Sequence, residues 1–233
     1  MVGRRRRFTP DGEESAIRKE PVDGPVRVTK DGPEGDEHVY HGHGGPEKAV
    51  LQFDRDRYQT FRSRFPEFQA DIDGARRGFG ENISAAGMSE DTVCIGDRYR
   101  IAPSAFDEGE SSRRDGVVVE VTGHRQPCYK LGINSGVREL PRIMQEEGAT
   151  GWYYRVIEEG YIASGDEFTL LARPNPQWPV GEFIRRFYGT PLDREYLESA
   201  LQVDKLGTNL KQLIESRLKS GNVESWDSRL YGT

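Results

Sequence analysis

The chain has 233 residues, of which 34% are apolar, and its 33 basic and 39 acidic residues give a net charge of −6. A chain of this length can bury a hydrophobic core large enough to fold without disulfide bonds or a structural metal. The acidic balance argues against general affinity for nucleic acid or anionic membranes. No apolar run approaches the roughly 20 residues that cross a bilayer. The basic stretch 4–7 lacks the apolar segment of a secretory signal, and two cysteines make no disulfide scaffold, so we expect a cytoplasmic protein.

The first third of the chain predicts short strands and one helix. Residues 26–28 and 48–53 are strand candidates within a loop-rich region. Asp54 can cap a helix whose aromatic residues recur at helical spacing until Pro66 ends it.

The middle of the chain predicts strands at 92–101, 117–123, 151–160 and 167–173, and a helix at 140–148 that ends at a glycine. Two of these regions share a pattern of strand, Gly-Asp and strand, in which glycine supplies backbone freedom and aspartate bonds nearby amides. Many short strands with few helices favour a closed β-barrel over a βαβ sheet.

The composition changes at 173–181, where three prolines mark a linker. Beyond it, residues 180–189, 193–202 and 208–221 carry apolar residues at helical spacing, and Asp193 is an N-cap candidate. These segments predict a small three-helix unit.

We therefore predict a mainly β fold with α additions. A closed β-barrel domain would span residues 1–175, and a three-helix domain would span 176–233. The helices also permit a helix-turn-helix interpretation, but acidic residues interleave the scattered basic ones, so we expect no nucleic-acid partner.

Four stretches contain residue types that are unusual in a purely structural core: HGHGGPEKAV (41–50), GFGENI (78–83), RQPCYKL (125–131) and GWYYRV (151–156). In the second, glycines let backbone amides approach a ligand, and Asn82 can both donate and accept hydrogen bonds. A glycine turn with an Asx-type cap explains the same motif.

The first stretch, with His38 before it, suggests two alternatives. One is a three-histidine metal site formed by His38, His41 and His43, although the spacing fits no familiar tetrahedral pattern. The other is a turn that binds phosphate or other ligand oxygens. We favour the turn.

Cys128 follows Pro127 and is flanked by Arg125 and Lys130. Positive charges favour the thiolate, which is the form that attacks or binds a soft metal. A buried structural cysteine is the alternative interpretation, which we assign to Cys94 because it lies in an apolar run.

In this order, the four stretches resemble the MOSC domain family, named for the molybdenum cofactor sulfurase C-terminus, and within it the YiiM-like branch. The resemblance covers nearly the whole chain, and the tail from Val180 looks like the three-α domain that follows MOSC in that branch. It implies a MOSC-type β-barrel followed by helices.

The resemblance also implies a molybdenum cofactor protein in which Cys128 is the catalytic residue and the protein ligand to the metal. The candidates for the rest of the cofactor pocket are His43, Gly44, Gly45, Gly80, Glu81, Asn82, Arg125, Gln126, Lys130 and Trp152. Pyridoxal phosphate binding is associated with the family as well, and we attach no residue to it.

The implied reaction is reduction of small N-hydroxylated substrates such as hydroxylaminopurines, with electrons from a separate reductase because no Fe–S cysteine set is present. The proton donor stays open among His43, Glu81 and Tyr153. The alternative is a non-catalytic carrier that holds the cofactor or passes sulfur through a Cys128 persulfide. The oligomeric state is open, with a homodimer as one alternative.

Overall fold

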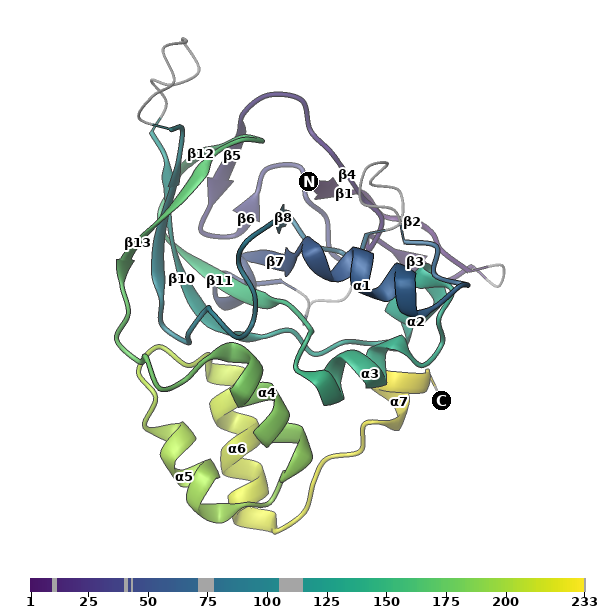
Figure 1. The fold of residues 1–233 in the computed structure, drawn as a ribbon, viewed down its shortest axis with the longest axis vertical. Coiled ribbons are helices and arrows are strands. Elements are labelled where there is room, and N and C mark those ends of the chain that lie inside the picture. The colour runs from purple at the N-terminus through teal and green to yellow at the C-terminus, as the bar shows by residue number, and fades with distance from the viewer. Residues whose placement is uncertain (10–11, 40–41, 43, 71–77, 105–114, 233) are drawn as a thin grey trace.

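The computed structural model describes residues 1–9, 12–39, 42, 44–70, 78–104 and 115–232 (Figure 1). Its strands are β1 (Val2–Gly3), β2 (Arg6–Arg7), β3 (Glu14–Ser15), β4 (Lys19–Glu20), β5 (Val26–Thr29), β6 (Gly32–Pro33), β7 (Val50–Asp54), β8 (Ile83–Ala85), β9 (Arg98–Ala102), β10 (Val117–His124), β11 (Trp152–Glu158), β12 (Gly160–Ile162) and β13 (Glu167–Ala172). The helices are the 3-10 turn η2 (Pro46–Lys48), α1 (Asp56–Arg64), α2 (Tyr129–Ser135), α3 (Leu140–Glu147), α4 (Val180–Gly189), α5 (Arg194–Leu201), α6 (Thr208–Ser220) and α7 (Asp227–Tyr231).

The main sheet has six strands in the order β13-β9-β10-β11-β7-β8 and curls into a half-barrel (Figure 1). A three-stranded sheet, β12-β5-β6, and two short ribbons, β1-β4 and β2-β3, complete the β part. The predicted fold class, mainly β with helical additions, is confirmed. The hydrogen-bonded ladder of the described strands is open between β8 and β13, and residues of both strands line a cavity of about 730 Å³.

The two Gly-Asp segments fold as the same turn. Gly96 and Gly165 adopt φ angles of +84° and +92°, which favour glycine. The carboxylates of Asp97 and Asp166 each accept a hydrogen bond from the backbone N–H three residues earlier, at 2.9 and 2.7 Å. The strand predicted after Gly96-Asp97 is present as β9 from Arg98, whereas the segment predicted as a strand before this turn forms only an isolated bridge at Cys94.

The predicted helices after the linker are present as α4, α5 and α6. Asp193 caps α5 as predicted, since its side chain accepts a hydrogen bond from the Tyr196 backbone N–H at 3.1 Å. Helices α2 and α7 were not predicted, because each is short and carries no long apolar period.

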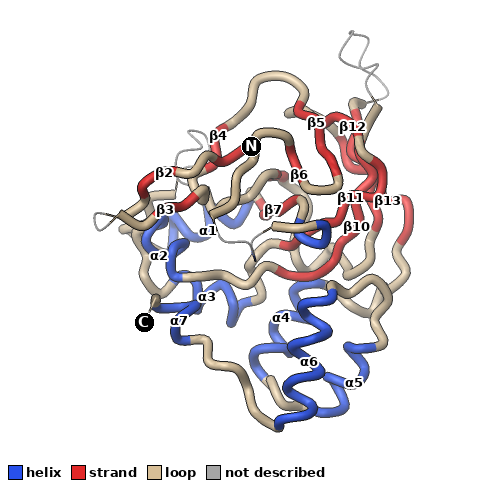
Figure 2. Tube along the Cα trace, turned by 180° about the vertical axis from the view of Figure 1, so that it is seen from behind, coloured by secondary structure: helices blue, strands red, loops and turns tan. Residues whose placement is uncertain are grey.

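Helices α4, α5 and α6 lie against the lower end of the curled sheet (Figures 1 and 2). Val121 and Trp152 of the sheet share one apolar cluster with Phe183 and other residues of these helices. The bulge at Gly123 admits α6, because a Cβ atom there would lie 2.4 Å from the Cδ1 atom of Leu210. The helical unit therefore sits directly on the end of β10.

Among the described residues, no helix combines the length and the apolar character that a membrane span requires.

Candidate active site

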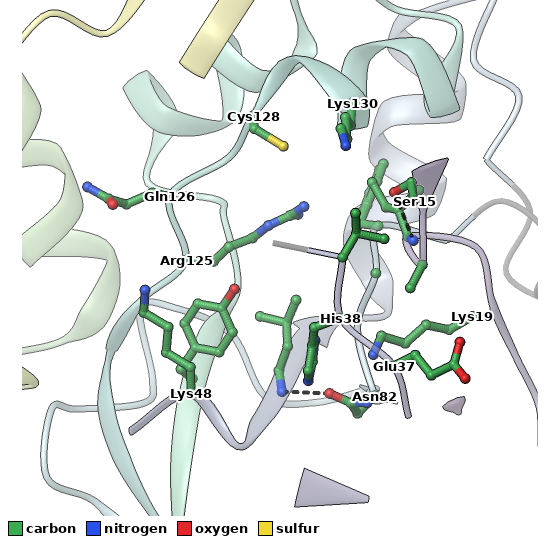
Figure 3. A pocket seen from close by; sticks show the side chains of 17 residues that line it. Ser15, Lys19, Glu37, His38, Lys48, Asn82, Arg125, Gln126, Cys128 and Lys130 are labelled. Atoms are coloured by element: carbon green, nitrogen blue, oxygen red, sulfur yellow. Dashed lines mark hydrogen bonds between the residues drawn. The ribbon is translucent and has the colours of Figure 1, made fainter. Parts of the chain in front are cut away.

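A small cavity of about 80 Å³ opens where loops from several parts of the chain meet beside β7, β10 and β11 (Figure 3). Its wall is formed by Ser15, Ala16, Ile17, Lys19, Glu37, His38, Val39, Lys48, Leu51, Phe79, Gly80, Asn82, Arg125, Gln126, Cys128, Lys130 and Tyr153. Five of the ten predicted pocket residues thus meet Cys128 at one cavity: Gly80, Asn82, Arg125, Gln126 and Lys130.

Cys128 lies at the junction between the end of β10 and the start of α2. Its backbone is extended, with φ −124° and ψ 165°, and its side chain makes no capping hydrogen bond. The residue is half-buried, and its sulfur points toward the cavity (Figure 3). The thiol is therefore placed to meet a ligand from the cavity side.

Arg125 reaches the same cavity from the end of β10. Its backbone N–H donates to the Gly151 carbonyl at 3.0 Å, which continues the pairing with β11, and its side chain extends toward Cys128 (Figure 3). The residue is 7% exposed, and its buried Nη1 atom has no hydrogen-bond partner in the described part of the chain. A buried cationic donor without a partner is costly, so this atom is suited to an anionic ligand.

Lys48 and Tyr153 form the adjacent wall. The Lys48 Nζ atom donates to the Gly42 carbonyl at 2.9 Å and lies 5.9 Å from the centre of the Tyr153 ring. Burial lowers the pKa of Lys48 and raises the pKa of the Tyr153 hydroxyl. An anion in the cavity would raise the pKa of this lysine again, because it would stabilise the positive charge.

The other two cations at the cavity are already paired. Lys19 forms a buried ion pair with Asp36, and the Lys130 Nζ atom lies 2.8 Å from the Glu13 carboxylate. No such ion pair is formed by Arg125 or Lys48 within the described residues. Uncompensated positive charge is therefore concentrated on the Arg125 and Lys48 side, which suits a phosphate or similar group.

The GFGEN stretch mostly builds the wall instead of presenting free polar groups. The Asn82 side chain accepts a hydrogen bond from the Leu51 backbone N–H at 3.0 Å and donates to Asp36 at 2.8 Å. Glu81 is fully buried, where it accepts hydrogen bonds from the Tyr58 hydroxyl and the Phe79 backbone N–H. Burial raises the pKa of Glu81.

Several other predicted residues are not seen to present a polar group to the cavity. His43 and His41 fall outside the described residues. Gly44 backs onto the His38 ring, and Gly45 faces open space. Gln126 lines the cavity, but its amide points away from Cys128 and donates to the Tyr188 hydroxyl at 3.3 Å (Figure 3).

Trp152 shows why strand alternation matters. It is fully buried in the sheet core, together with Tyr154, whereas Tyr153 between them lines the cavity. Successive side chains of a strand point to opposite faces, so one register step separates core from site. This alternation in WYY was the signal that could have favoured Tyr153 over Trp152.

Lys19, His38 and Lys48 line the cavity without having been predicted there. Burial lowers the pKa of His38, whose Nε2 atom lies 4.0 Å from the Asp36 carboxylate. The described ranges contain no group of three His, Cys, Asp or Glu side chains that could hold a metal ion. The three-histidine alternative also requires His41 and His43, which lie outside those ranges.

The fold and the cavity define a class of protein in which a curled β-sheet carries a thiol beside two cations, Arg125 and Lys48, that form no ion pair within the described ranges. The chain belongs to the MOSC domain family, which matches residues 39–169. The resemblance inferred from the sequence is thereby confirmed.

Relatives extend this similarity to nearly the whole chain. Protein YiiM of Escherichia coli strain K12 is 32% identical over 224 residues, which cover 96% of this chain and 93% of that protein. A protein named "Reductase" from Gibberella moniliformis is 40% identical over 168 residues, covering 71% of this chain but only 27% of that protein.

Two solved YiiM structures share the fold. The structure from Escherichia coli gives a TM-score of 0.72 at 27% identity and covers 91% of this chain and 93% of its own. The structure from Geobacillus stearothermophilus gives 0.71 at 26% identity, with coverage of 93% and 95%. Family and relatives together indicate a function related to the molybdenum cofactor.

Proposed function

We propose that the protein is a molybdenum cofactor-dependent reductase that cleaves the N–O bond of small N-hydroxylated compounds such as hydroxylaminopurines. One observation carries this proposal: the Cys128 thiol, Lys48 and Arg125, whose buried Nη1 atom has no hydrogen-bond partner among the described residues, line a single cavity. Membership of the MOSC family and similarity to a relative named as a reductase support it.

The residues at the cavity fit this cofactor. A thiolate is a soft ligand that suits a sulfur-rich metal centre, so Cys128 would bind molybdenum. Arg125 and Lys48, which lack carboxylate partners among the described residues, would hold the phosphate and other oxygens of the pterin. When bound, the cofactor would supply the electron pair that breaks the N–O bond, and a separate reductase would replenish it.

The chain itself must supply a proton, because cleavage of an N–O bond by two electrons consumes two protons and releases an amine and water. Tyr153 is the described candidate that lines the cavity, whereas Glu81 is sealed beneath it. Burial raises the pKa of Tyr153, so its hydroxyl stays protonated at neutral pH. The phenol therefore carries a proton that it can donate to the leaving oxygen.

A sulfur or cofactor carrier is the second candidate, favoured by the partial exposure of Cys128. A carrier needs a thiol that a partner can reach, and it shows no turnover with N-hydroxylated substrates. A reductase turns over such substrates once electrons are supplied, for example with benzamidoxime or 6-hydroxylaminopurine.

The decisive experiment is metal and pterin analysis of the natively purified protein, paired with reduction assays. We expect molybdenum in the wild type and in Cys94→Ser, and its loss together with activity in folded Cys128→Ala. Full reductase activity of Cys128→Ala would refute the assignment. Molybdenum binding without turnover would favour the carrier.

A further inference from the structure

The carboxyl-terminal helices contact both walls of the cavity. Besides the shared apolar core, two of their polar contacts reach residues directly next to Lys48 and Cys128 in the sequence. We propose that these helices act as a clamp, in which Glu47 positions the Lys48 wall and Arg229 positions the Cys128 wall. That the two walls hold a cofactor rests on the proposed function. The positioning of the walls by the helices does not depend on it.

The first contact joins η2 to the start of α6. Glu47 accepts hydrogen bonds from the Thr208 backbone N–H at 2.7 Å and from the Thr208 hydroxyl at 3.1 Å. Arg155 of β11 approaches the same carboxylate at 3.3 Å, and the Thr122 hydroxyl donates to the Glu47 carbonyl at 2.7 Å. Lys48 is the next residue, so the turn that carries it is fixed to both the sheet and α6.

The second contact joins α7 to the segment before Cys128. Arg229 donates from Nη1 to the Pro127 carbonyl at 2.6 Å and from Nη2 to the Gln145 side chain at 2.7 Å. A planar guanidinium with two fixed donors restricts the orientation of the peptide that it holds. Because this carbonyl belongs to the peptide that precedes Cys128, its orientation sets the direction of the thiol.

Such contacts matter because Lys48 lies in a single 3-10 turn and Cys128 lies in the segment that joins β10 to α2. Loops open locally at lower free energy than core strands and helices, so a binding site made of loops needs external support. Hydrogen bonds to charged groups are stronger than those between neutral groups. The helical unit can provide this support because it shares its core with the sheet.

The first test replaces Thr208 with proline. Thr208 is the first residue of α6, where proline is well tolerated, and Gly207 before it already has the extended backbone that a following proline prefers. Thr208→Pro therefore removes both hydrogen bonds to Glu47 and preserves the helix, whereas Thr208→Ser keeps both bonds.

Hydrogen exchange read by mass spectrometry over residues 44–50 measures the effect. We expect exchange about five- to thirtyfold faster in Thr208→Pro, the factor that loss of one or two such bonds implies, and wild-type rates in Thr208→Ser.

The second test uses Arg229→Gln, with Arg229→Lys as the conservative variant, both in a Cys94→Ser background so that Cys128 is the only thiol. We expect several-fold faster exchange over residues 128–135 and faster alkylation of Cys128 by iodoacetamide in Arg229→Gln. Arg229→Lys should restore part of the wild-type behaviour, because it keeps one charged donor.

The two variants provide a crossed comparison. Thr208→Pro should leave Cys128 alkylation unchanged, and Arg229→Gln should leave exchange over 44–50 unchanged. Wild-type rates at the targeted wall, or an equal rise throughout α4, α5 and α6, would overturn the clamp. Molybdenum content of Cys128→Ala tests the proposed function separately, because neither exchange nor alkylation requires the cofactor.

Discussion

The two cysteines of this chain lie in short segments beside strands, with opposite surroundings. Cys94 is 3% exposed, and its thiol donates to the Pro176 carbonyl at 3.7 Å. Burial, together with the nearby Asp97 carboxylate, raises the pKa of this thiol. Cys128 is half-buried, makes no capping hydrogen bond and faces a cavity. The same type of side chain is thus buried at Cys94 and accessible from a cavity at Cys128.

An arginine accompanies each cysteine, and the two arginines differ in the same way. Arg173 binds Asp97 through two nitrogens, at 2.9 and 2.7 Å, so its charge is neutralised beside Cys94. Arg125 has a buried nitrogen without a partner in the described residues. The cation beside Cys94 is therefore already satisfied within the protein, whereas the cation beside Cys128 can still bind an anionic ligand.

Tyr153→Phe should cause the largest loss of activity at the cavity that Cys128 faces. Loss of the proton donor should lower the turnover of N-hydroxylated substrates about 100-fold, the lower end of the range for general acid catalysis. Molybdenum content should not change, because the phenol is not proposed to bind the metal. Steady-state kinetics and metal analysis on one preparation check both statements, and unchanged turnover would remove Tyr153 from the proposed mechanism.

The pH dependence of stability tests whether His124, which precedes Arg125, has a structural role. It is buried against Tyr188, and burial, with nearby Arg229 and Arg217, lowers its pKa to about 3. The unfolded chain binds a proton at this histidine as the pH falls through about 6.5, whereas the folded chain does not, so stability falls with acidification in this range.

We expect His124 to account for about 2 kcal/mol of lost unfolding free energy between pH 7 and pH 5. Urea titrations at the two pH values measure it, and His124→Gln should reduce the pH-dependent loss by that amount. An equal loss in the variant would show that other groups titrate instead.

Arg125→Gln should weaken cofactor retention about tenfold, because a charge-assisted contact to an anion is lost. The fold should be little affected, since the buried Nη1 atom has no hydrogen-bond partner in the described residues. Arg173→Gln is the matched control, which should lower stability and leave retention unchanged. If cofactor retention depended on Arg173 instead, the assigned difference between the Cys94 and Cys128 regions would be wrong.

Cys94→Ser should have the smallest effect, a loss of about 1 kcal/mol in unfolding free energy with normal cofactor content. A hydroxyl in this site keeps a donor for the Pro176 carbonyl but fits a sulfur-sized space less well. Cofactor loss from the folded variant would contradict the structural role of Cys94.

The sequence by itself determined the features that depend on near neighbours. Helical spacing located α4, α5 and α6, Asp193 marked the start of α5, and the Gly-Asp pairs marked two turns. These signals work because caps, turns and amphipathic faces are set by residues within a few positions of each other. The neighbours of Cys128, and the resemblance of the surrounding motifs, likewise marked it as the candidate ligand.

Tertiary structure decided which polar groups remain free. Lys130 beside Cys128 in sequence is paired with Glu13, more than 100 positions away, and Asn82 is committed to Asp36 and Leu51. Arg125 alone of the flanking pair keeps a buried nitrogen without a partner in the described residues. Partner choice over such separations follows from how strands and loops pack together, and no local pattern encodes it.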